Sequence, residues 1–287
     1  MTGEGATTAA AVRARIEPLV RRAGDHLLRS FEHLSDDDIH LKGSIDLVTR
    51  LDVEAESILV EGLGRAFPDD VVIAEESARA EAAAGRRIWY VDPLDGTTNF
   101  VHGLPVFAVS VAGVRAGRVE VGCVFAPYLD ELFWAVAGGG AWLGERRLQV
   151  SGRAPLDGAL LATGFPYDVR TNPHDNLAEW TSLARRCRGL RRLGAAALDL
   201  AYVAAGRFDG YWEFRLKPWD LAAGVLLVLE AGGRVTDPAG GAAWLQGDLV
   251  ATNGLVHDEL VGALESVRGE QGREVARARE PRPPNGV

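Results

Sequence analysis

The sequence predicts a mixed α+β fold in which layers of helix and sheet alternate, with α/β character in its second half. Three observations lead to this prediction. Apolar residues recur at helical spacing across 12–31, short apolar strands follow one another across 71–150, and strands alternate with helices across 160–267. A layered order of helix, sheet, helix, sheet and helix follows.

The chain has no linker that would separate its two halves. We therefore expect a single domain over residues 1–267, with two lobes at about 1–150 and 151–267. Residues 268–287 are charged and rich in proline, with little apolar content, so they are predicted to form a disordered tail.

Composition narrows the class of protein. The chain has 287 residues, 47% of them hydrophobic, which is enough for a sizeable core, and its formal net charge of -9 disfavours a broad nucleic-acid-binding face. Cys123 and Cys187 lie far apart with no C-x-x-C pattern, so we expect free thiols in a reducing compartment. No leader-like segment or apolar run of membrane-spanning length is apparent, which predicts a cytoplasmic protein without a membrane partner.

The first half is expected to begin with two helices. Pro18 interrupts the first helical pattern, so that helix either starts near Pro18 or kinks there. Thr49 followed by Asp52 resembles a capping box, which predicts a second helix that ends near Phe67. The strands expected to follow are 71–74, 88–91, 107–114, 119–125, 132–137 and 148–150.

The second half of the chain is expected to alternate between strands and helices. Its predicted strands are 160–163, 190–193, 210–213, 234–236 and 249–251, and its predicted helices are 177–187, 196–205, 221–231 and 257–267.

The stretch from Val91 to Phe100 contains several candidate metal-binding and phosphate-binding residues close together. Asp92 and Asp95 stand three residues apart after an apolar strand, and Gly96 then frees the backbone to turn. Two acids at a strand end, beside small residues whose N–H groups can face an anion, suit a divalent cation that holds a phosphate. The alternative is an ordinary turn rich in Asp, Gly and Thr.

Other acids also fall at element ends: Asp52, Glu75 and Asp220. Each has a structural explanation, as a helix cap for Asp52 and Asp220 or as a solvated strand end for Glu75. Their recurrence after apolar strands favours a site assembled from several elements. Carboxylates without His or Cys select Mg²⁺, Mn²⁺ or Ca²⁺ over zinc.

These motifs, taken together, resemble the inositol monophosphatase family of metal-dependent phosphatases. The resemblance covers roughly Val12 to Val267 and implies a five-layer α-β-α-β-α sandwich. The motifs that carry it are Asp92-Pro-Leu-Asp95-Gly-Thr97-Thr98-Asn-Phe, Asp46-Leu-Val-Thr49-x-x-Asp52, Glu75-Glu76-Ser77, and Trp219-Asp220 followed by Glu230-Ala-Gly-Gly233.

The resemblance implies a site for two to three Mg²⁺ ions, with Mn²⁺ as the alternative. The implied ligands of the first ion are Glu75, Asp92 and the carbonyl of Leu94, those of the second are Asp92, Asp95 and Asp220, and a third, weaker ion shares Glu75. Thr97, with Asp52 behind it, is implied to position the attacking water, since a carboxylate partner strengthens a weak base.

Substrate contacts are also implied by the resemblance. Gly96, Thr97, Thr98 and their neighbours face the phosphate, Lys42 lies near the third ion, Gly194, Ala195 and Ala196 line the polyol pocket, and Glu213 accepts a hydrogen bond from a sugar hydroxyl. The chain departs from many relatives at Ala195, where they carry Ser or Thr, and the lost hydroxyl loosens polyol recognition or signals another ester. Thr98, where relatives that act on other esters more often carry Lys, favours a small polyol phosphate.

The expected activity is phosphate release from inositol monophosphate or a similar small polyol phosphate. The alternatives on the same scaffold are a histidinol-phosphate, adenosine-bisphosphate or fructose-bisphosphate phosphatase, or a regulatory binding protein that acts on the transcription machinery. G-x-x-x-x-G-K-[ST], G-x-G-x-x-G, G-x-S-x-G and H-E-x-x-H patterns are absent from the sequence, which disfavours kinases, dinucleotide enzymes, serine hydrolases and zincins. The resemblance also implies a homodimer and, weakly, lithium sensitivity.

Overall fold

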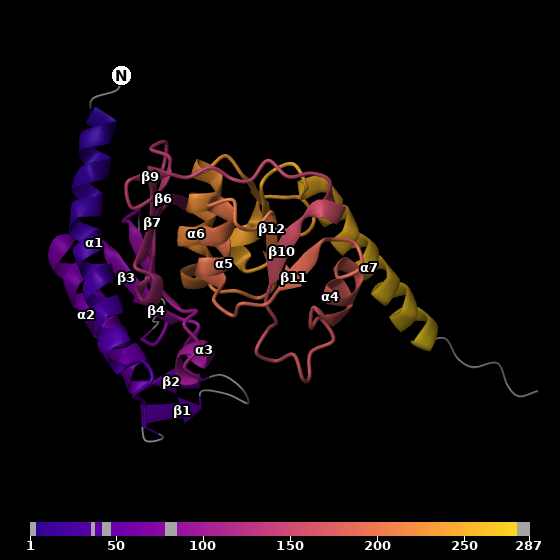
Figure 1. Cartoon of the computed structure of the whole chain (residues 1–287), viewed down its shortest axis with the longest axis horizontal. Coiled ribbons are helices and arrows are strands. Elements are labelled where there is room, and N and C mark those ends of the chain that lie inside the picture. Colours follow the sequence, from indigo (N-terminus) through magenta and orange to yellow (C-terminus); the bar gives the residue numbers. More distant parts are fainter. Residues whose placement is uncertain (1–3, 36–37, 42–46, 78–84, 280–287) are drawn as a thin grey trace, which may run out of the picture.

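The computed structural model describes residues 4–35, 38–41, 47–77 and 85–279. These residues form helices and sheets stacked in five successive layers, in the order helix, sheet, helix, sheet, helix (Figure 1). The predicted α-β-α-β-α sandwich is therefore confirmed. Within the described ranges, no helix is both long enough and apolar enough to cross a membrane.

The outer layer of the N-terminal lobe consists of α1 (Glu4–Ser30) and α2 (Arg50–Ala66), which pack on a seven-stranded sheet. Strands β3 and β4 of this sheet are parallel, whereas every later neighbour is antiparallel. The sheet runs in the order β3 (Val71–Ala74), β4 (Ile88–Asp95), β5 (Ala108–Arg115), β6 (Arg118–Ala126), β7 (Glu131–Val136), β8 (Ala141–Leu143) and β9 (Arg146–Arg147).

The middle layer is formed by α5 (Ala196–Ala204) and α6 (Pro218–Glu230), which are enclosed between the two sheets. The outermost helices α4 (Leu177–Leu183) and α7 (His257–Arg279) cover the far face of the second sheet (Figure 1). That sheet has the order β11 (Gly189–Arg191), β10 (Leu160–Thr163), β12 (Gly210–Glu213), β14 (Leu249–Thr252) and β13 (Arg234–Thr236).

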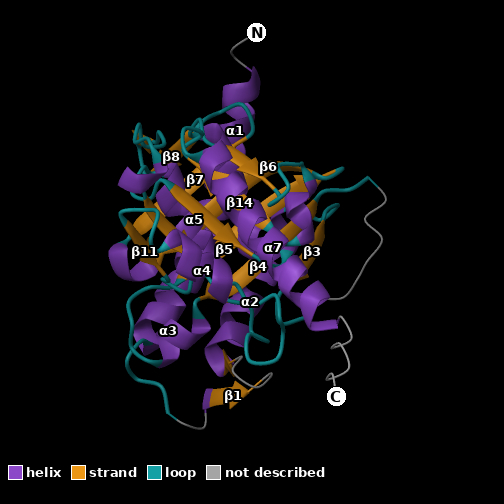
Figure 2. Ribbon diagram, turned by 90° about the vertical axis from the view of Figure 1, so that its right-hand side faces the viewer, coloured by secondary structure: helices purple, strands orange, loops and turns teal. Residues whose placement is uncertain are grey.

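Two small elements complete the N-terminal lobe. A hairpin of β1 (Ile39–Leu41) and β2 (Leu47–Thr49) lies at one end of the molecule, and the short helix α3 (Thr97–Val101) packs beside β2 (Figures 1 and 2). The hairpin was not predicted, because three-residue strands leave little periodic signal.

The structure corrects two predictions at prolines. Helix α1 continues through Pro18, so the expected start near Pro18 is wrong, whereas the alternative of a kink there stays a prediction. Strand β4 continues through Pro93 to Asp95, where a turn was expected, and its register with β5 shifts between Asp92 and Asp95. Pro93 has no N–H to donate, and it is tolerated because the hydrogen-bond ladder between β4 and β5 is interrupted at this position.

Several other boundaries also differ from prediction, among them that of α4, which ends at Leu183 and not at 187. Helix α6 begins at Pro218, so Asp220 is its third residue and not its cap. The expected strand at 148–150 is irregular. Helix α7 continues to Arg279, so the predicted disordered tail is wrong for residues 268–279, where no proline interrupts the helical hydrogen bonds before Pro281.

Candidate active site

The parallel pairing of β3 and β4 brings three of the predicted acids to one sheet edge. Ala74 lies opposite Val91, and the backbone N–H of Glu75 donates to the Val91 carbonyl at 3.1 Å. The carboxyl ends of parallel strands meet at the same edge, where ligands commonly bind. Glu75 therefore lies beside the continuation of β4 that carries Asp92 and Asp95.

Gly96 turns the chain from β4 into α3. Its φ of +95° lies in the left-handed region, and a Cβ there would stand 2.9 Å from the Val106 carbonyl oxygen and 3.3 Å from that of Gly194. Both the backbone angle and the space require glycine. The close approach places the Gly194 loop directly against the start of α3.

Asp95 joins the two lobes. Its Oδ1 accepts a hydrogen bond from the Ala196 N–H at 3.0 Å, and its Oδ2 accepts one from the Ala197 N–H at 2.8 Å. Ala195, at the N-cap of α5, offers no side-chain hydrogen bond, so Asp95, which comes from the first half of the chain, satisfies buried N–H groups that have no partner within the helix.

Asn99 fixes the same junction from α3. Its buried side-chain amide donates to the Val106 carbonyl at 2.8 Å and to the Leu193 carbonyl at 2.7 Å. Because the Leu193 carbonyl immediately precedes Gly194, Asn99 holds the predicted pocket loop against α3. The sequence reasoning gave Asn99 no role.

Asp220 reaches the site from the first turn of α6. Its Oδ2 accepts a hydrogen bond from the Lys217 N–H at 2.6 Å, which closes the start of the helix. The Ser110 hydroxyl of β5 donates to the Trp219 carbonyl at 3.1 Å, and this contact anchors the helix start to the first sheet. Asp220 thus closes the helix start as the third residue of a capping box and not as the N-cap expected from sequence, and it also lines the cleft described below.

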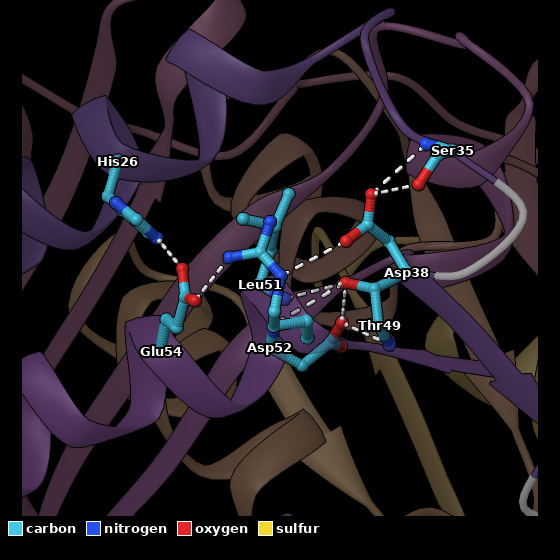
Figure 3. A network of polar contacts seen from close by, with 8 residues as sticks. His26, Ser35, Asp38, Thr49, Leu51, Asp52 and Glu54 are labelled. Atoms are coloured by element: carbon cyan, nitrogen blue, oxygen red, sulfur yellow. Dashed lines mark hydrogen bonds and ion pairs between the residues drawn. The ribbon is translucent and has the colours of Figure 1, made fainter.

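Thr97 and Asp52 are in direct contact. The Thr97 hydroxyl oxygen lies 3.1 Å from Asp52 Oδ1 and 3.0 Å from the Leu94 carbonyl oxygen. The other oxygen of Asp52 accepts hydrogen bonds from Thr49, from the N–H at 2.8 Å and from the hydroxyl at 2.5 Å (Figure 3). The predicted capping box is confirmed, and it orients Asp52 so that the carboxylate serves both the helix and Thr97.

Burial and mutual repulsion raise the pKa values of the acids. Burial raises the pKa of Asp92 well above its usual range, and the charges of Glu75, Asp95 and Asp220 raise it further. Burial also raises the pKa of Asp95 to about 7, against the N–H groups of Ala197 and Ala196, and that of Asp220 to about 8. Such a cluster is costly when ionised, and a bound cation would relieve the repulsion.

The donor set suits a hard cation, although the acids are not gathered as the ligands of one. All candidate ligands offer oxygen, as Mg²⁺ prefers. Among the residues that the structure describes, no three His, Cys, Asp or Glu side chains stand close enough together to hold an ion. Asp92, Asp95 and Asp220 each accept backbone N–H groups instead.

An open cleft of about 660 Å³ is lined by residues from both halves of the chain, and most of the predicted residues line it. They are Glu75, Asp92, Leu94, Asp95, Gly96, Thr97, Gly194, Ala195, Ala196, Glu213 and Asp220. Asp52 stands behind Thr97 and does not line the cleft, and neither does Thr98, so the phosphate contact of Thr98 stays a prediction. Lys42 lies outside the described residues.

Several cleft residues were missed by the sequence reasoning. The loop after β10 contributes Phe165, Tyr167 and Asp168, and cations are contributed by Arg192, Arg215 and Lys217. Arg215 pairs with Asp168 across the cleft wall. These residues occupy irregular segments, where neither apolar period nor motif spacing points to them.

The fold and cleft define a layered α/β protein with an acid-rich site where the first sheet meets helices α5 and α6. The chain belongs to the inositol monophosphatase family, whose sequence model matches residues 9–268. The family expectation from the sequence is thereby confirmed.

Relatives support this assignment over most of the chain. An inositol-1-monophosphatase of Mesorhizobium japonicum is 43% identical over 85% of this chain and 92% of its own length. A Nus factor SuhB of Pseudomonas aeruginosa is 48% identical, over 81% of this chain and 88% of its own length. In structure, the extragenic suppressor protein suhB of Bartonella henselae gives a TM-score of 0.84 at 41% identity, covering 89% of this chain and 98% of its own. The inositol monophosphatase of an Anabaena species gives 0.80 at 39% identity, covering 88% and 94%.

Proposed function

We propose that this chain is a Mg²⁺-dependent phosphatase that releases phosphate from inositol monophosphate or a similar small polyol phosphate. The observation that carries the proposal is the convergence of Asp92, Asp95 and Asp220 on one cleft, where the charges of Asp95 and Asp220 raise the pKa of Asp92. Membership of the inositol monophosphatase family and relatives named for that activity support it.

The proposed metal ligands are Glu75, Asp92, Asp95, Asp220 and the Leu94 carbonyl. When bound, Mg²⁺ would supply positive charge that polarises phosphate oxygens and makes a nearby water more acidic. The backbone N–H groups at the start of α3, from Gly96 onward, are proposed to contact the phosphate.

Thr97 and Asp52 are proposed to position the attacking water. A hydroxyl has one proton, and when Thr97 donates it to Asp52, the lone pairs of the Thr97 oxygen remain to accept a hydrogen bond from water. As the water attacks, its proton would pass to the Thr97 oxygen while the Thr97 proton passes to Asp52, whose negative charge is thereby neutralised. In-line attack needs this orientation more than it needs a strong base.

A panel assay tests the proposal. Phosphate release is measured with Mg²⁺, and again with a chelator, on inositol 1-phosphate, fructose 1,6-bisphosphate, histidinol phosphate, adenosine 3',5'-bisphosphate and an aryl phosphate. Inositol phosphate should give the highest kcat/KM, with release lost in chelator. A higher value for any other ester would move the assignment to that ester, and metal-independent release would overturn it.

A second candidate is a regulatory binding role, because several relatives at 43–48% identity are named Nus factor SuhB. Such a role is compatible with enzyme activity. Binding to purified RNA polymerase and Nus proteins, compared between the wild type and Asp220→Asn, separates the two functions: binding that survives loss of turnover indicates an independent partner surface. We also propose that the protein is cytoplasmic and that it forms a homodimer. Sedimentation of the purified protein would test the dimer.

A further inference from the structure

The carboxylate of Glu213 is fixed in the cleft wall by residues that the predicted site does not contain. Glu213 ends β12, where it lines the cleft. The residues around it determine which way its oxygens face, and therefore what its carboxylate can bind.

Tyr211 holds one oxygen of this carboxylate. It stands two residues before Glu213 on β12, so both side chains lie on the same face of the strand. The Tyr211 hydroxyl donates to Glu213 Oε2, and the Tyr211 side chain is fully buried. A buried tyrosine with its only proton committed in this way cannot turn to another acceptor.

Gly164 confines the carboxylate from another side. A Cβ built on Gly164 would stand 2.2 Å from both carboxylate oxygens of Glu213, so any side chain there would displace the group. Gly164 follows the last residue of β10, the strand that pairs with β12.

Asn176 locks Gly164 to β12. Its amide nitrogen donates to the Gly164 carbonyl at 2.7 Å, while its carbonyl oxygen accepts a hydrogen bond from the Trp212 indole N–H at 2.7 Å. Asn176 is 1% exposed and has a φ of +70°, a conformation that Asn tolerates better than most residues. The strain of this backbone conformation is offset because the amide nitrogen and the amide oxygen of Asn176 both make hydrogen bonds.

The arrangement leaves Glu213 incomplete without a ligand. In the part of the chain that the structure describes, Tyr211 supplies the one hydrogen bond that reaches this carboxylate. An ionised carboxylate can accept about four. Its remaining lone pairs border the cleft, where donors on a substrate or water would satisfy them.

We propose that Tyr211, Gly164 and Asn176 are positioning residues that hold Glu213 as the acceptor for a hydroxyl of the leaving group. Through Glu213 they set the preference for polyol phosphates over phosphate esters whose leaving group has no hydroxyl. The inference rests on the proposed phosphatase function and extends it to residues outside the family motifs quoted above.

The test compares two substrates in a double-mutant cycle. Tyr211→Phe, Glu213→Gln and the double variant are assayed with Mg²⁺ on inositol 1-phosphate and on phenyl phosphate, which has no free hydroxyl. Tyr211→Phe should raise KM for inositol phosphate about tenfold while changing phenyl phosphate turnover less than about twofold. In the Glu213→Gln background the same change should cost nothing further.

Tyr202→Phe is the matched control. The Tyr202 ring packs against Phe133 and Phe208 away from the cleft lining, so this substitution should leave both substrates unaffected. If Tyr211→Phe does not fold, Gly164→Ala carries the test, since it displaces Glu213 without removing the hydroxyl and predicts the same split between substrates.

Two outcomes overturn the inference: equal losses on both substrates, which indicate a merely structural role, or additive losses in the cycle, which show that Tyr211 does not act through Glu213. Failure of the proposed function looks different, because the wild type would then release no phosphate from inositol 1-phosphate in Mg²⁺, before any variant is compared.

Discussion

The Thr97 hydroxyl oxygen lies 3.1 Å from Asp52 Oδ1, although 45 residues separate the two in sequence. The contact exists because Thr97 opens α3 directly after the Gly96 turn, while Asp52 occupies the first turn of α2. Asp52 therefore has two roles: it caps the start of α2, and it orients Thr97 in the candidate site.

Removing the Thr97 hydroxyl should lower kcat with little change in KM. Thr97→Val keeps the shape of the side chain but cannot orient a water, so we expect a loss of about 10²–10⁴-fold in kcat. Thr97→Ser keeps the hydroxyl and is the control, with a much smaller loss. Steady-state phosphate release measures both, and a Thr97→Val variant as active as Thr97→Ser would exclude the role.

The metal-free protein should become less stable as pH rises through the acid cluster. Burial raises the folded-state pKa values of Asp95 and Glu213 to about 7 and that of Asp220 to about 8, whereas the unfolded values lie near 4. The folded state therefore binds more protons at these groups between about pH 4 and 8, so their contribution to stability is greatest below this window and is lost as pH rises through it.

Thermal melts in chelator from pH 6.5 to 9 measure this effect. Mg²⁺ should raise the melting temperature more at pH 8 than at pH 6.5, because it binds the ionised carboxylates. A melting temperature that does not change with pH, in chelator, would contradict the electrostatic account.

His257 should produce the opposite dependence at lower pH. The ring is fully buried, 3.0 Å from the Thr236 hydroxyl and 2.9 Å from that of Thr252, and burial lowers its pKa to about 4. Between about pH 4 and 6.5 the unfolded state takes up the proton and the folded state does not, so stability falls as pH falls. The full contribution is about 3 kcal/mol.

The matching variant is His257→Asn, which removes the titrating group. Urea unfolding at pH 4.5 and 6.5 should show a smaller difference for this variant than for the wild type. An equal difference in both proteins would assign the acid sensitivity to other groups.

Restoring the missing hydroxyl at Ala195 should favour inositol phosphate. Ala195 is 1% exposed, lines the cleft and offers no side-chain hydrogen bond at the start of α5. Ala195→Ser should lower KM for inositol 1-phosphate by about two- to tenfold, the effect of one added hydrogen bond. Ala195→Gly is the control, and an equal KM for both variants would show that this position does not contact the polyol.

Much of the architecture could be predicted because the spacing of apolar residues along the sequence indicates most helices and strands. The cap at Thr49 and the strand at Val71–Ala74 were predicted within a residue, as was most of the alternation in the second half. The path through Pro18 and Pro93 could not be, because tertiary packing overrides the local cost of proline.

The candidate site was likewise predicted only in part. The acids stand out because their motifs are compact in sequence, whereas Asn99 and Asn176 act on carbonyls brought close only by the fold. The second role of Asp95, capping α5 across more than a hundred residues, is equally invisible to spacing. Asp95→Asn is therefore expected to weaken the start of α5 as well as to remove a charge from the site, since an amide can accept only one of the two N–H groups in the same way.

Asp220→Asn therefore gives the most direct test of the central claim. An Asn carbonyl can retain the hydrogen bond from the Lys217 N–H, so the helix start survives while the negative charge is lost. Phosphate release from inositol 1-phosphate, measured against Mg²⁺ concentration, should fall about a hundredfold or more relative to the wild type. Unchanged release at every Mg²⁺ concentration would contradict the assignment of this cleft as a metal-dependent phosphatase site.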